Sequence, residues 1–205
     1  MKQQLKSRAL VVASVAAVVG LMLAPVAASA VAQNTTVTAV VQGSIAIAQS
    51  GNVSFNVTPV SGGSQSSGNH TVTVTTNNAL GYTLNLKDLD ATLTLDGPSA
   101  NTIAASSNTM AAATTLANNT WGWAIPSGTT GAATNTFDAS YTNFTDQTSS
   151  ATKWAGILAT DQLIKSTSGP AGSGDPLVVN YSAKVDPTKA VGSYTDTVVY
   201  TATVK

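Results

Sequence analysis

The sequence contains no cysteine and no glutamate, and its single arginine is Arg8, close to the start of the chain. Without cysteine the protein forms no disulfides, carries out no thiol chemistry and offers no cysteine for lipid attachment. Arginine is the preferred residue for bidentate contacts with phosphates and bases, and nucleic-acid-binding domains normally carry a basic stripe. Neither is present after Arg8, so nucleic acid is not an expected partner.

Charged side chains are also scarce, at 9% of the chain, and His70 is the single histidine. General acid–base catalysis needs a titratable group with a partner within reach, and neither glutamate nor cysteine is available to partner His70. A lone histidine at the head of a strand is usually solvated. We therefore expect a protein that is not an enzyme, without catalytic residues or a cofactor.

Three aspartates, Asp88, Asp90 and Asp96 in "KDLDATLTLDG", are the candidates for a calcium site. Hard cations take several oxygen ligands, but an EF-hand loop requires a third acid two residues after the second, followed by glycine. This spacing differs, and Asp88 and Asp90 are better explained as residues that flank a turn. No metal site is expected.

The N-terminus has basic residues within its first eight positions, followed by the apolar run Ala9–Leu23 and then by Pro25. This order, with small residues after it, is typical of a signal peptide over residues 1–30, cleaved after Ala30 or Ala32. An uncleaved anchor is the alternative, because the apolar stretch is long enough to span a bilayer. We expect an exported protein with no membrane segment in its mature form.

The mature chain, residues 31–205, has a length that suits one domain with its own core. Removing the three N-terminal basic residues leaves six lysines against nine aspartates, a net charge of −3. Serine, threonine and asparagine make up more than a third of it. Threonine favours strands, whereas asparagine, serine and glycine favour turns, so this composition is typical of an all-β protein.

Short alternating segments separated by Gly and Asn turns predict a single antiparallel Greek-key-like β-sandwich. Strands are expected at Thr35–Val41, Ser44–Ala48, Val53–Thr58, His70–Thr76, Tyr82–Leu86, Ala91–Gly97, Thr120–Ile125, Lys153–Ala159, Leu177–Val185 and Val191–Lys205. Gly62–Asn69 and Ser166–Pro176 are expected as loops, and Ser99–Asn119 as a short helix or an ordered excursion. The predicted core comprises Val53, Phe55, Val57, Val72, Val74, Tyr82, Leu84, Leu86, Trp121, Trp123, Val179, Tyr181, Val198 and Tyr200.

The C-terminal strand has one apolar face and one threonine face, because side chains alternate with period two. Thr195, Thr197, Thr201 and Thr203 form the polar face, which can stay in water and is a candidate binding surface. Trp121 and Trp123 are added to this candidate surface, because paired aromatic residues on a sheet can stack on sugars. Burial in the core is the favoured alternative for both tryptophans, since Ile125 follows on the same parity.

Two further patterns concern structure. Lys184 and Asn180 share a face of the penultimate strand, which suggests a Lys–Asn cross-link, although solvated lysines are the better default. Gly192 precedes Tyr194 at a strand entry, as in the tyrosine corner of Greek-key sandwiches. Tyr194 is therefore expected to bury its ring and to bond to backbone upstream.

The segments "GSYTDTVVYTATVK" and "NNALGYTLNLKD" resemble two segments of the WxL-type domains of Gram-positive surface proteins. The tryptophans that name that family would fall near Tyr82 and Tyr200, and both are tyrosine here. The resemblance implies the β architecture and, less directly, binding to the cell wall.

These patterns together predict an exported, non-enzymatic bacterial surface protein. Its sandwich would hold it non-covalently to a cell-wall polymer or to another surface protein. The alternative is a pilin-like fibre subunit that self-assembles by donating its mature N-terminal strand, "AQNTTVTAVVQG", to a neighbour's sheet.

Overall fold

The computed structural model describes residues 31–125 and 153–205, so the signal peptide predicted for residues 1–30 lies outside the described residues. The chain divides into two units, Met1–Val41 and Gln42–Lys205. In the described part of the first unit, residues 31–41 form no strand or helix, and the valines there are 76–88% exposed. The strand predicted at Thr35–Val41 is therefore absent: alternation alone does not form a strand without a partner to accept its hydrogen bonds.

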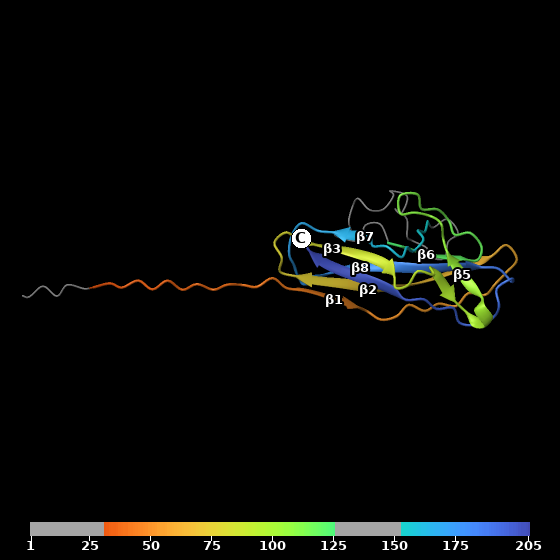
Figure 1. Ribbon diagram of the computed structural model, residues 1–205, viewed down its shortest axis with the longest axis horizontal. Coiled ribbons are helices and arrows are strands. Elements are labelled where there is room, and N and C mark those ends of the chain that lie inside the picture. The colour runs from red at the N-terminus through yellow and green to blue at the C-terminus, as the bar shows by residue number, and fades with distance from the viewer. Residues whose placement is uncertain (1–30, 126–152) are drawn as a thin grey trace, which may run out of the picture. The chain divides into compact units, whose positions relative to one another are not determined.

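The second unit is built from β-strands arranged in two sheets (Figure 1). The six-stranded sheet has the order β1-β2-β8-β6-β5-β4, and the three-stranded sheet has the order β7-β3-β9. The strands are β1 Ile45–Gln49, β2 Ser64–Thr76, β3 Tyr82–Asp88, β4 Thr94–Asp96, β5 Thr102–Ala105, β6 Thr120–Ala124, β7 Gln162–Ser166, β8 Ala171–Val185 and β9 Val198–Val204.

The all-β prediction is confirmed: in the described residues the helical content is one 3-10 turn, Pro98–Ala100. The prediction of a purely antiparallel fold is wrong for one pair, because β5 runs parallel to β6. The connection between these two strands, residues 106–119, is an ordered excursion rather than a hairpin, so it can return the chain in the same direction.

The longest pairing joins β2 and β8, and it includes both polar stretches that were predicted to be loops. Ser64–Asn69 pairs with Asn180–Val185, and Ala171 and Asp175–Leu177 pair with the other half of β2. Both loop predictions are wrong over most of their length and hold at residues 62–63 and 167–170, which lie outside strands. The ladder is made by backbone groups, which serine and glycine supply as well as valine does. Gly68 also has a packing role: a Cβ there would lie 2.9 Å from the Val53 side chain.

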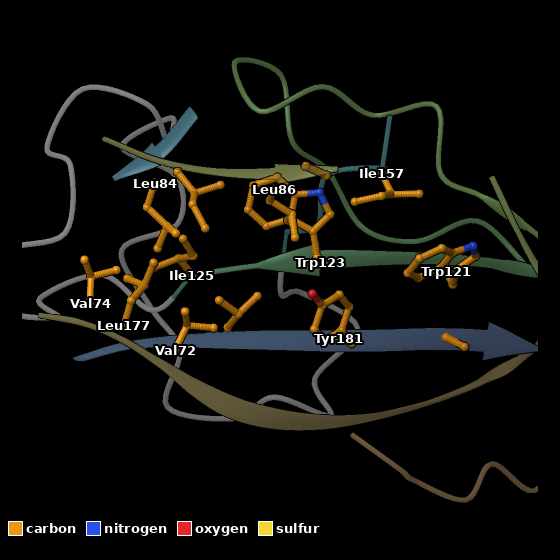
Figure 2. Close-up of a cluster of buried hydrophobic side chains, with 14 of the residues drawn as sticks. Val72, Val74, Leu84, Leu86, Trp121, Trp123, Ile125, Ile157, Leu177 and Tyr181 are labelled. Carbon is orange, nitrogen blue, oxygen red and sulfur yellow. The ribbon is translucent and has the colours of Figure 1, made fainter. Parts of the chain in front are cut away.

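The core lies between the sheets, and Figure 2 shows Leu84 and Leu86 of β3 facing Val72 of β2 and Tyr181 of β8. Nine predicted core residues are buried, which confirms them: Val72, Val74, Tyr82, Leu84, Leu86, Trp121, Trp123, Val179 and Tyr181. The other five are half-buried against the same cluster: Val53, Phe55, Val57, Val198 and Tyr200.

The segment predicted as a strand at Val53–Thr58 forms no ladder, although its side chains alternate as predicted. Val53, Phe55 and Val57 turn toward the core, whereas the residues between them are exposed. This segment covers the core through its side chains without joining a ladder, so the apolar pattern correctly predicted its inward face but wrongly predicted a strand.

A second, smaller apolar cluster consists of Ala113, Leu116, Ala124 and Trp154. It joins β6 to the excursion after β5 and to the segment around Trp154, where the strand predicted at Lys153–Ala159 is reduced to isolated bridges. Gly156 makes the closest approach here: its N–H donates to Asn108 O at 2.8 Å, and a Cβ would lie 1.7 Å from Ser106 O.

This contact predicts that Gly156→Ala destabilises the protein by about 3 kcal/mol or more, because the clash is with backbone that cannot rotate away. Gly169→Ala is the matched control, since a Cβ at Gly169 meets nothing within 4 Å. Urea denaturation of both variants measures the difference. Equal stability of the two variants would show that Gly156 is not in this close contact.

Candidate functional site: the seam between β1 and β9

Two edge strands, one from each sheet, lie close to each other without pairing. We call this region the β1–β9 seam, formed by Ile45–Gln49 and Val198–Val204. Within the described residues, β1 pairs with β2 alone, and β9 pairs with β3 alone. The seam is therefore the place where the two sheets face each other with unpaired edges.

Hydrogen bonds at the strand ends show which backbone groups of β1 and β9 face the seam. Lys205 N–H donates to Gly81 O, and Leu89 N–H donates to Thr197 O, so the odd-numbered residues of β9 bond toward β3. Backbone groups alternate along an antiparallel strand, so those of the even-numbered residues face the seam. Ser50 N–H donates to Thr71 O, and by the same alternation the odd-numbered residues of β1 face the seam.

The seam carries apolar side chains and no charge. Ile45, Ile47 and Val204 are 36–43% exposed, and neither Ile45–Gln49 nor Val198–Val204 contains a charged residue. Residues 31–86 as a whole contain no Asp, Glu, Lys or Arg. Natural edge strands are usually protected from pairing by lysine, proline or bulges. These edges lack protecting charges, so they are suited to accepting another strand.

A polar cluster lies inside the seam and joins the two sheets. Tyr200 of β9 bonds through its hydroxyl to His70 Nε2 at 2.7 Å and to the Tyr181 hydroxyl at 2.6 Å. His70 Nδ1 lies 3.0 Å from Gly51 O. Burial raises the pKa of both tyrosines well above their usual range, so the hydroxyls remain protonated and act as hydrogen-bond donors.

His70 is therefore not a solvated residue, which corrects the sequence-based expectation. It sits within β2, with its side chain on the inner face shared by Val72 and Val74, and it is buried. Its two ring nitrogens are occupied by Tyr200 and Gly51. A buried polar group needs such partners, so the geometry gives this histidine a structural role between the sheets.

The predicted threonine face is exposed at all four positions, Thr195, Thr197, Thr201 and Thr203. Thr201 pairs with Asn85 of β3, and Thr203 pairs with Thr83, so neutral polar residues continue onto the neighbouring strand. The outer face of β9 therefore carries two threonines and Val199, which lies opposite Lys87 of β3.

Trp121 and Trp123 are buried, so in this structure they offer no stacking surface for a sugar. Trp123 donates its indole N–H to Gly156 O at 3.1 Å. The favoured interpretation of these residues as core is correct. Because both are buried, they do not belong on the candidate binding surface.

The three candidate calcium ligands serve separate local turns and strands. Asp88 accepts from Asp90 N–H, Asp90 accepts from Thr92, and Asp96 accepts from the Thr94 hydroxyl. Among residues 31–125 and 153–205, no group of three or more acidic or histidine side chains is placed to hold a metal ion.

The remaining structural predictions have mixed outcomes. Tyr194 donates its hydroxyl to Ala190 O at 2.9 Å, and its half-buried ring packs against the core, as a tyrosine corner requires. Lys184 and Asn180 lie on the same strand, β8, where residues four apart are separated by about 13 Å and cannot cross-link.

In the described part of the chain, no helix is long and apolar enough to cross a membrane.

Comparison with known proteins finds no matching family model, no matching curated protein and no matching solved structure. The resemblance to WxL-type domains thus remains a prediction from sequence.

The entry to β9 carries a pH-sensitive group. Burial, together with the nearby carboxylates of Asp88 and Asp90, raises the pKa of Asp196 from 3.8 to about 6. The folded protein thus holds this proton more tightly than the unfolded chain does. The protonated carboxyl group of Asp196 therefore contributes stability that is complete below about pH 4 and is lost as the pH rises through 6.

We therefore expect Asp196→Asn to gain stability relative to the natural protein as the pH is raised from about 4 to 6. Urea denaturation at several pH values measures this difference. Asp161→Asn makes the same substitution at an exposed aspartate and is the matched control. A stability difference between Asp196→Asn and the natural protein that stays constant from pH 4 to 6 would contradict the raised pKa of Asp196.

Proposed function

We propose that the mature protein is an exported, non-enzymatic bacterial surface protein that assembles into fibres by strand donation. The N-terminal segment of one copy adds as a strand at the β1–β9 seam of the next copy. Two observations carry this proposal. The segment 31–41 is uncharged, forms no strand or helix and exposes its valines, and two strands, β1 and β9, have uncharged edges that are unpaired among the described residues.

The donated segment has the properties that strand addition requires. Residues 31–41 form no structure of their own, and Val37, Ala39 and Val41 fall on one parity. A strand added to a sheet edge gains backbone hydrogen bonds, while its alternate side chains fill apolar positions. Exposed valines on that segment and exposed isoleucines on β1 would both be removed from water by this contact.

The proposal predicts that the mature chain forms fibres and that removing residues 31–41 leaves it monomeric but folded. Val37→Lys with Val41→Lys should reduce assembly more than tenfold, because two charges would enter an apolar contact. Thr36→Lys with Thr38→Lys is the matched control, which adds the same charge on the other face and should assemble far better. Sedimentation velocity and electron microscopy measure assembly, and circular dichroism checks folding. A natural chain that is monomeric at every concentration, or fibres that persist without residues 31–41, would overturn it.

A second candidate function is binding to a neutral cell-wall polymer through the threonine face of β9. The exposed hydroxyls of Thr195, Thr197, Thr201 and Thr203 favour it, as does the sequence resemblance to WxL-type domains. Hydroxyl rows can hydrogen-bond to polyhydroxylated polymers without the cost of burying charge.

This second function predicts that Thr197→Lys with Thr201→Lys weakens pelleting with purified cell wall and leaves the fold unchanged. Both side chains are exposed, so the substitutions place hydrated charges at a neutral contact without altering the core. Circular dichroism checks the fold in parallel. Unchanged pelleting of a folded variant would remove the threonine face as the binding surface.

A further inference from the structure

A fully buried lysine lies in the interior between the two sheets. Lys165 of β7 is paired with Leu84 of β3, whose side chain is in the core, and the Lys165 side chain is 0% exposed. Lysine is almost never fully buried unless its ammonium group has a partner.

The partner comes from the opposite sheet. Asp175 of β8 is the cross-strand neighbour of Val74, another core residue, and its side chain is 19% exposed. Lys165 Nζ lies 2.5 Å from Asp175 Oδ1. The Tyr82 hydroxyl donates to Asp175 Oδ2 at 2.7 Å. One carboxyl group is therefore held by two side chains from two strands of the facing sheet.

The contact between Lys165 and Asp175 is a buried ion pair, and its ammonium group has few partners. An ammonium group has three N–H donors, and among the described residues Lys165 Nζ bonds to Asp175 alone. Removing two charges from water is expensive. A neutral amine is a nucleophile, and it forms when an ammonium group passes a proton to the carboxylate that it contacts.

We propose that Lys165 and Asp175 condense to an intramolecular amide that covalently joins β7 to β8. The lone pair of Lys165 Nζ attacks the Asp175 carboxyl carbon and forms the new C–N bond. Oδ1 takes up one proton from the nitrogen in addition to the carboxyl proton, and the C–Oδ1 bond breaks to release water. The nitrogen keeps one hydrogen and Oδ2 becomes the amide oxygen, so no oxidant, reductant or co-reactant is required.

Tyr82 is placed to assist this step. Its hydroxyl already points at Oδ2, the oxygen on which negative charge develops when the amine adds. A fixed hydrogen-bond donor at such an oxygen stabilises the transition state. Burial, followed by the bond to Asp175, raises the pKa of Tyr82 well above its usual range, so it keeps its proton. The released water has an exit, because Asp175 borders a surface hollow lined by residues 166–175 and Lys205.

The decisive measurement is the mass and lysine reactivity of the purified mature protein in denaturant. We expect a mass about 18 Da below that of the sequence, the loss of one water. Reductive methylation should modify every free lysine but not Lys165, and proteolysis should yield a branched peptide that links Lys165 to Asp175. A succinimide at Asp96–Gly97 would also lose one water, but it would leave Lys165 reactive.

Variants test the roles of the three residues. Asp175→Ala and Lys165→Met should both have the full sequence mass, whereas Asp161→Ala, which removes the exposed partner of Lys87, should keep the loss of one water. Tyr82→Phe should leave a larger fraction uncondensed at a given time after folding. The natural protein decides the question even if a variant fails to fold. A natural protein with full mass and a reactive Lys165 in denaturant would overturn the proposal.

Discussion

The pairing of β2 with β8 is the constraint on which the rest of the structure depends. It is the longest ladder in the described chain, and it places His70 and Tyr181 on one face with the core valines. The same ladder places Asp175 opposite Val74, where it contacts side chains of the three-stranded sheet. Because a one-residue slip would turn every side chain to the opposite face, this register fixes both polar links between the sheets.

The two sheets are joined by polar contacts as well as by apolar packing. At one site Asp175 accepts hydrogen bonds from Lys165 of β7 and Tyr82 of β3. At the other site Tyr200 of β9 bonds to His70 and Tyr181. In a chain without cysteine, disulfides cannot join the layers. Buried polar contacts of this kind favour one relative placement of the sheets, since any shift would break them.

The unpaired edges have a different physical character from the interior. The interior satisfies the polar groups of His70 and Asp175 with partners, whereas backbone groups along the β1–β9 seam face outward with no strand beside them in the described residues. Such edges are a liability when left open, because they promote association. The absence of charge along both edges is consistent with an association that is part of the function proposed above.

Alternation along single segments was sufficient to predict an all-β protein, the inner faces of β2, β3 and β6, and the bond from Tyr194 to backbone upstream. These properties are local, because a side chain's face depends on its parity alone. Partner choice is not local. The strand character of Ser64–Asn69, the parallel β5–β6 pair and the contact between Lys165 and Asp175 were not predicted. Each depends on which distant backbone lies alongside, and the hydrogen bonds that decide this are made by peptide groups that every residue shares.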